Sequence, residues 1–84
     1  MKGQIVCSKA GRDKGYFMVV VGVEDGYVLV CDGKERPLER PKRKNVKHIK
    51  TTRSFVTEDD CKSNKHLRKA LAVFKDFAKI KEEL

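Results

Sequence analysis

The fold of this chain is decided by a short polar stretch, SKAGRDKGYF at residues 8–17. An apolar stub at residues 5–7 leads into the stretch, and an apolar run at residues 17–23 leads out of it. Gly11 and Gly15 lie close together near its centre. Because glycine adopts positive φ at little steric cost, this spacing predicts a tight turn between two strands.

Patterns of short strands continue on both sides of this turn. We expect strands at residues 4–8, 16–23, 27–31, 36–40 and 45–50. The second is apolar almost without a break, which predicts that both of its faces are covered. Five short strands joined by tight turns are typical of a small half-open barrel of the SH3-like kind, so the expected fold is mainly β with a C-terminal helix.

The period of the apolar residues changes to helical spacing towards the C-terminus. Leu67, Leu71, Phe74 and Phe77 recur on one helical face, and such a stripe needs a partner to cover it. We expect it to pack on the barrel, with Phe74 largely buried. The predicted organisation is a barrel at residues 1–53, a linker at residues 54–62 and a helix at residues 63–84.

The positive charge of the chain is concentrated in one segment. The 84 residues have a formal net charge of +8, and residues 34–53 carry nine Lys or Arg against two Glu, which gives that segment +7. A concentrated positive field implies a polyanionic partner. RNA is favoured ahead of DNA and of an acidic membrane surface. No apolar run has the length of a membrane-spanning helix, so we expect no membrane partner.

The cysteines and histidines do not indicate a metal site. Cys7, Cys31 and Cys61 are odd in number and have no Cys-x-x-Cys spacing, and only two histidines are present. Cys7 and Cys31 lie in apolar strand patterns, where free cysteine behaves as a small buried hydrophobe. We therefore expect no metal and no cofactor, and a reducing cytoplasmic location.

Several strings resemble one known family. The Gly-x-x-Lys-Gly turn at residues 11–15, between apolar strands, resembles the KOW motif, a short RNA-binding element of ribosomal and transcription-factor proteins. With DGKxR at residues 32–36, RPKRKNVKHI at residues 40–49 and NxxLRKAL at residues 64–71, the chain is similar to a family of small bacterial KOW-domain RNA-binding proteins. That family is itself similar to the archaeal and eukaryotic large-subunit ribosomal protein numbered fourteen. The resemblance implies an SH3-like barrel, RNA binding, association with the ribosome and no catalytic activity.

Two sets of side chains are the candidate RNA-binding residues. They are Lys9, Arg12 and Lys14 on the Gly-rich turn, and Arg40, Lys42, Arg43, Lys44, Lys47, His48 and Lys50 in the basic segment. Cations of this kind bind phosphates without reading sequence, so we expect binding to structured RNA with weak sequence preference. Since exposed charges contribute little to folding, replacing Lys42, Arg43 and Lys44 together is expected to leave thermal stability almost unchanged.

Other roles for these residues stay open. Arg12 and Lys14 are also compatible with ordinary solvated loop charges. Lysines on an edge strand discourage aggregation, which accounts for one or two cations of the basic segment. His48 fits a stacking role and a structural role equally well. Asp13 is expected to hold the turn by bonding a backbone amide.

The sequence favours a binding protein over an enzyme. It has no paired carboxylates beside a candidate acid, no Ser-His-acid arrangement and no phosphate-binding Walker loop. We expect a monomeric RNA-binding protein, with ribosomal RNA and ribosomal proteins as candidate partners. The alternative is an SH3-like protein-interaction module of the translation or transcription machinery. Tyr16 and Tyr27 are open to two interpretations, as stacking platforms for bases or as packing residues.

Overall fold

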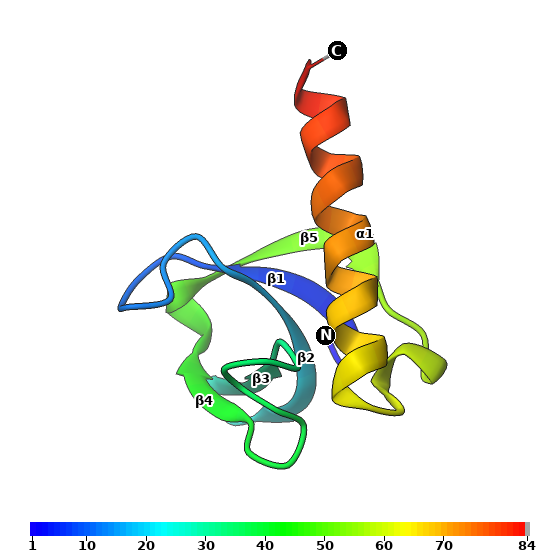
Figure 1. Ribbon diagram of the computed structural model, residues 1–84. Coiled ribbons are helices and arrows are strands. Elements are labelled where there is room, and N and C mark those ends of the chain that lie inside the picture. The colour runs from blue at the N-terminus through cyan, green and yellow to red at the C-terminus, as the bar shows by residue number, and fades with distance from the viewer. Residues whose placement is uncertain (84) are drawn as a thin grey trace.

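The computed structural model describes the backbone of residues 1–83 and the side chains of residues 1–76. Within that part of the chain, strands come first and the long helix last (Figure 1). The strands are β1 (Gln4–Ser8), β2 (Phe17–Glu24), β3 (Tyr27–Cys31), β4 (Lys42–Asn45) and β5 (Ile49–Phe55). The helices are the single-turn 3-10 helices η1 (Val46–His48) and η2 (Asp59–Cys61) and the α-helix α1 (Asn64–Glu83).

The strands form one antiparallel sheet in the order β4-β3-β2-β1-β5. The sheet curls without closing, so β4 and β5 are its two edges (Figure 1). This arrangement is a small half-open barrel of the SH3-like kind. The prediction of a mainly β fold with a C-terminal helix is therefore confirmed.

The barrel has one apolar cluster on each face of its sheet. The inner cluster consists of Val6, Met18, Val20, Val28, Val30 and Ile49. The outer cluster, beneath α1, is built on Ile5, Val19, Cys31, Leu67 and Leu71. Successive side chains of a strand point to opposite faces, so β2 contributes to both clusters. Double burial accounts for the apolar residues 18–20, as expected, whereas Val23 at the end of the run is 59% exposed.

The last two strands differ from the prediction. Residues 36–40 form no strand; they belong to the long loop between β3 and β4, and the fourth strand is the Lys-Arg-Lys-Asn segment that follows. Residues 46–48 form η1, because the side chain of Asn45 accepts a hydrogen bond from the backbone N–H of Lys47 at 2.9 Å. The fifth strand begins at Ile49 and extends to Phe55, into the predicted linker.

Polar side chains fasten β5 to β1. Thr52 Oγ1 donates to the carbonyl oxygen of Ile5 at 2.7 Å, and Gln4 Nε2 donates to the carbonyl oxygen of Thr52 at 2.7 Å. These bonds lie where the register between the two strands shifts. They hold an edge strand that has few apolar residues of its own.

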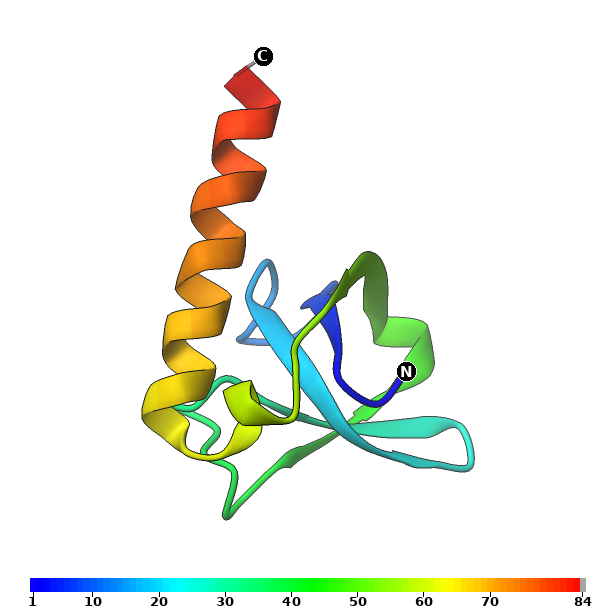
Figure 2. The same cartoon turned by 90° about the vertical axis from the view of Figure 1, so that its right-hand side faces the viewer.

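The N-terminal half of α1 packs on the outer face of the sheet. Leu67 and Leu71 are buried, and Phe74 is partly buried with its ring edge-to-face on Phe17, the ring centroids lying 5.1 Å apart. The C-terminal half of the helix projects beyond the barrel (Figures 1 and 2). The prediction that Phe77 also belongs to the packed stripe lies outside the described side chains.

Gly33 joins the start of α1 to the loop between β3 and β4. Its φ is +80°, and a Cβ at this position would lie 2.5 Å from the carbonyl oxygen of Asn64. Arg68 Nη1 donates to the carbonyl oxygen of Gly33 at 2.8 Å, and Asn64 Oδ1 accepts from the backbone N–H of Leu38 at 2.8 Å. The first turn of the helix therefore fixes the position of this loop.

Candidate nucleic-acid interface

The Gly-rich loop (residues 9–16) is a tight, hydrogen-bonded turn. Gly11 and Gly15 have φ of +85° and +87°, which confirms the turn expected from their spacing. The backbone N–H of Gly15 donates to the carbonyl oxygen of Ser8 at 2.8 Å, closing the base of the loop. Arg12 and Lys14 lie between the two glycines, and both are exposed. The loop therefore presents two cations on a defined backbone.

Asp13 holds this loop against β4 through side chains. Its Oδ1 accepts from Lys44 Nζ at 2.8 Å and from Ser8 Oγ at 2.7 Å, while its Oδ2 accepts from Lys42 Nζ at 3.0 Å. Among the described residues its carboxylate bonds no backbone amide, so the partner expected for it was wrong.

The charge of Asp13 is fixed by these contacts. Burial raises the pKa of the Asp13 carboxyl, but the hydrogen bonds from Lys44, Ser8 and Lys42 outweigh burial and hold that pKa well below its usual range. Asp13 is therefore ionised, and its single negative charge is exceeded by the two ammonium groups that contact it.

Lys44 is a structural residue in this arrangement. Its side chain is only 7% exposed, and Nζ also donates to the carbonyl oxygen of Ala10 at 2.9 Å. A phosphate would have to displace these partners and enter a buried position. The expectation that Lys44 is an exposed cation was wrong, because its ammonium group is buried against Asp13. Lys42 keeps 29% of its side chain exposed beside Asp13.

A second contact, between backbone groups, joins the Gly-rich loop to η1 in the basic segment. The N–H of Lys9 donates to the carbonyl oxygen of His48 at 2.8 Å, directly after the pairing of Ser8 with Ile49. The loop and η1 consequently lie at the same end of the barrel (Figure 1). Lys47 and His48 in η1, and Lys50 at the start of β5, are exposed there.

The contacts of Arg43 and Arg40 are with segments outside the Gly-rich loop. Arg43 points away from Asp13: its Nε pairs with Glu24 at 3.1 Å, and its guanidinium carbon lies 3.9 Å from the centre of the Tyr27 ring. Arg40 is exposed in a turn closed by its own N–H, which donates to the carbonyl oxygen of Pro37 at 2.9 Å.

The exposed side chains at the Gly-rich loop and η1 form the basic face of the molecule. They are Lys9, Arg12, Lys14, Lys47, His48 and Lys50.

A hollow of about 250 Å³ borders the Gly-rich loop. Arg12 and Lys42 line one side of it, and Arg36, from the loop between β3 and β4, lines the other. Arg36 is absent from the candidate residues drawn from the sequence. The turn signal of Asp32 and Gly33 could have indicated it, because that turn folds the following residues back towards the Gly-rich loop.

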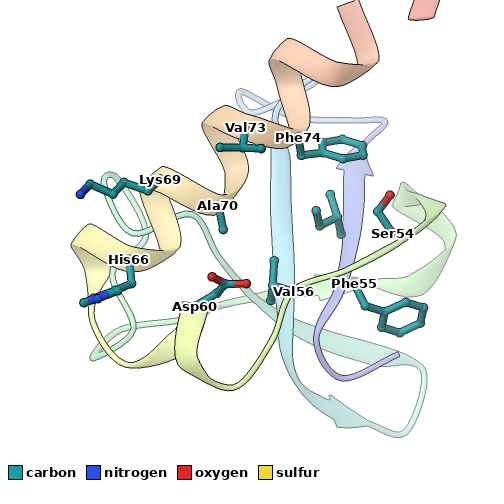
Figure 3. A pocket seen from close by; sticks show the side chains of 10 residues that line it. Ser54, Phe55, Val56, Asp60, His66, Lys69, Ala70, Val73 and Phe74 are labelled. Atoms are coloured by element: carbon teal, nitrogen blue, oxygen red, sulfur yellow. The ribbon is translucent and has the colours of Figure 1, made fainter.

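An apolar groove lies on the opposite side of the barrel, between α1 and the end of β5. Ala70 and Phe74 of the helix face Ser54 and Val56 across a space of about 520 Å³ (Figure 3). Val73 at its border is 69% exposed. The groove offers apolar contact area and no concentration of positive charge.

No group of three or more His, Cys, Asp or Glu side chains in the described part of the chain is placed to hold a metal ion. Within residues 1–83, no helix combines the length and the apolar character needed to cross a membrane. Comparison of the sequence with models of protein families and with curated proteins finds no match in either set.

Proposed function

We propose that this protein binds structured RNA through the basic face, in the manner that its resemblance to KOW-domain proteins implies. One observation carries the proposal: the backbone contact from Lys9 to His48 brings two separate cationic segments to one end of the barrel. Each cation that neutralises a phosphate releases condensed counterions, so neighbouring cations add to the affinity. The proposed role is binding, without catalysis.

The pairing of Asp13 supports the same function. An unpaired carboxylate between Arg12 and Lys14 would repel the phosphate that these cations attract. Asp13 is 12% exposed and contacts two ammonium groups, so its field at the loop tip is largely cancelled. Arg12 and Lys14 can therefore attract a phosphate with little opposition from Asp13.

A salt titration of binding tests the proposal. The probes are a structured RNA, a single strand and a duplex DNA. We expect affinity to fall as salt rises. The slope of the logarithm of affinity against the logarithm of salt concentration should be several units steep, with roughly 0.7–0.9 from each neutralised phosphate. The triple variant Arg12→Ala, Lys14→Ala and Lys47→Ala should make this slope shallower by about two to three units. It should weaken the binding of all RNAs to a similar extent.

The matched control removes three exposed lysines from the other end of the molecule. Lys62, Lys65 and Lys69 lie in or just before α1, away from the basic face. Their replacement by Ala changes the net charge equally and should reduce the slope far less. Equal slopes for the two triple variants would contradict the assignment of the interface, and tight binding that is insensitive to salt would falsify the phosphate-dominated mode.

A protein-interaction module is the second candidate function. The observation in its favour is the apolar groove between α1 and the end of β5, bordered by the exposed side chains of Phe55 and Val73. Absence of nucleic-acid binding at low salt would make this function the favoured one. A Val73→Asp variant would then be the first test of partner binding.

We further propose that the RNA is ribosomal and that the protein acts as a monomer in the cytoplasm. The reducing location is supported by Cys7, Cys31 and Cys61, all of which are free thiols. Co-sedimentation of the endogenous protein with ribosomal particles, and its release by high salt, would support this assignment. Sedimentation away from these particles at low salt would contradict it.

A further inference from the structure

The hollow beside the Gly-rich loop lies between two loops that side-chain hydrogen bonds hold in place. On one side Asp13 fixes the loop that carries Arg12 and Tyr16. On the other, Asp32 Oδ1 accepts from the backbone N–H groups of Lys34 and Arg36, both at 2.9 Å. The contacts of Gly33 with α1 also hold this loop between β3 and β4 in place. The hollow is therefore formed by the fold itself.

The charges that line the hollow are balanced. Three cations and three carboxylates line it, namely Arg12, Arg36 and Lys42 with Asp13, Asp32 and Glu35. Asp13 also pairs with the buried Lys44. A site for phosphate alone would have an excess of cations. Balanced charges suit a neutral group that has both donors and acceptors. At about 250 Å³ the hollow is smaller than the roughly 300–1,000 Å³ of ordinary ligand pockets, so it has room for one small planar group.

Tyr16 provides an aromatic surface at this position. Its side chain is 47% exposed, and it lines both this hollow and a neighbouring one of about 200 Å³. The side chain is accordingly accessible at both hollows and contributes little to the core. Aromatic rings presented in this way stack on unpaired bases of RNA.

We infer that this hollow binds one unpaired base of the RNA, stacked on Tyr16, with guanine preferred because its amino edge bonds the carboxylate of Glu35. The inference rests on the proposed function and adds selectivity at a single nucleotide. Guanine presents two neighbouring N–H donors on its Watson–Crick edge, which match the two oxygens of a carboxylate. Uracil presents mainly acceptors on that edge, which a carboxylate repels. The phosphate of the same nucleotide then reaches Arg12 at the rim.

The test uses four RNA hairpins that differ only in one loop nucleotide, G, A, C or U. At fixed salt we expect the wild-type protein to bind the G hairpin at least about fivefold more tightly than the U hairpin, since a bidentate pair discriminates by about that factor or more. Tyr16→Ala should weaken binding of the G hairpin about tenfold, whereas Tyr16→Phe should retain it. Tyr27→Ala is the matched control and should leave the G-to-U ratio unchanged.

A second variant tests the carboxylate. Glu35→Gln should reduce the G-to-U ratio towards one, while binding of the U hairpin stays equal or becomes tighter because a negative charge near the RNA is lost. Glu58→Gln removes an exposed carboxylate elsewhere and should preserve the ratio. Thermal unfolding of each variant verifies that it is folded.

The outcomes separate this inference from the proposed function. Equal binding of all four hairpins by the wild type, with the expected salt dependence, overturns the base site and leaves phosphate-mediated RNA binding standing. Failure of every hairpin to bind at low salt overturns both. A G preference that persists in both Tyr16→Ala and Glu35→Gln would place the selective contact elsewhere and overturn the assignment to this hollow.

Discussion

Asp13 is the residue on which the geometry of the Gly-rich loop depends. The variant Asp13→Asn would leave Lys44 buried without its counter-charge. We expect the free energy of unfolding to fall by about 3–5 kcal/mol, the usual cost of breaking a buried ion pair from one side. Urea denaturation at pH 7 measures the change. Glu24→Gln is the control, because its pair with Arg43 is exposed and should contribute no more than about 1 kcal/mol.

The same pair gives stability a dependence on pH. The pKa of the Asp13 carboxyl is lower in the folded chain than its ordinary value of 3.8, so the folded state favours the ionised form. Its contribution is fully present above pH 3.8 and is lost as the pH falls towards the lower folded pKa. The stability difference between wild type and Asp13→Asn should therefore shrink below about pH 4. A difference that stays constant down to pH 2 would contradict the assigned pKa shift.

Lys44 shows why the sequence could not reveal this pairing. Residues 42–44 read as a uniform run of cations, and nothing in their order separates a buried lysine from an exposed arginine. Alternation along a strand makes that separation, placing Lys42 and Lys44 towards Asp13 and Arg43 towards Tyr27. Replacing all three residues is therefore expected to destabilise the fold, contrary to the expectation from exposed charge alone.

At the scale of elements, the close contact of Gly33 with the first turn of α1 joins the helix to the loop between β3 and β4. Gly33→Ala would combine a strained positive φ with a Cβ that lies 2.5 Å from a backbone oxygen. We expect a loss of about 3–5 kcal/mol in the free energy of unfolding. Gly15→Ala has a similar φ of +87° but open space around the new Cβ, so it should cost only about 1–2 kcal/mol. Equal losses for the two variants would show that the close approach to the helix is relieved cheaply.

The docking of α1 is tested by its aromatic contact. Phe74→Ala removes a partly buried ring that packs on Phe17 and should cost about 3 kcal/mol, the low end for an aromatic residue removed from a core. The neighbouring variant Val73→Ala should change stability by less than about 0.5 kcal/mol, because that side chain is mostly exposed. Thermal melting of both variants compares them directly. An unchanged melting temperature for Phe74→Ala would indicate a helix that is not docked there.

The elements that could be predicted are those whose own residues carry an apolar pattern. The sequence predicts the first three strands nearly to the residue, because alternating or continuous apolar runs specify them. The Lys-Arg-Lys-Asn sequence of β4 has no apolar residue, so only its pairing with β3 and Asp13 makes it a strand. In β5 the apolar residues stand only at its two ends, Ile49 and Phe55, and the hydrogen bonds of Thr52 supply the rest. The hollow beside Tyr16 likewise depends on two loops meeting in space.

At the scale of the whole molecule, two parts of the surface differ in chemistry. The basic face lies at the Gly-rich loop and η1, and the apolar groove lies between α1 and the end of β5. A ligand that binds only the folded chain stabilises it by mass action. A structured RNA at about 100 times its dissociation constant should add about 2.7 kcal/mol and raise the melting temperature by about 10 °C or more. The variant Arg12→Ala, Lys14→Ala and Lys47→Ala should show a much smaller rise at the same RNA concentration, and a rise equal to that of the wild type would argue against the basic face.

The strand order also bears on how the chain acquires its structure. β1 to β4 each pair with the next strand in sequence, whereas β5 pairs with β1, from which three strands separate it along the chain. Pairings between distant segments are slow because the entropy of a long loop is lost before the contacts form. We expect the hairpin of β2 and β3 to be structured in the folding transition state, with the β1–β5 ladder and α1 joining later, a sequence that φ-value measurements would resolve. The barrel can then begin to assemble from its N-terminal half while the residues of the helix are still being synthesised.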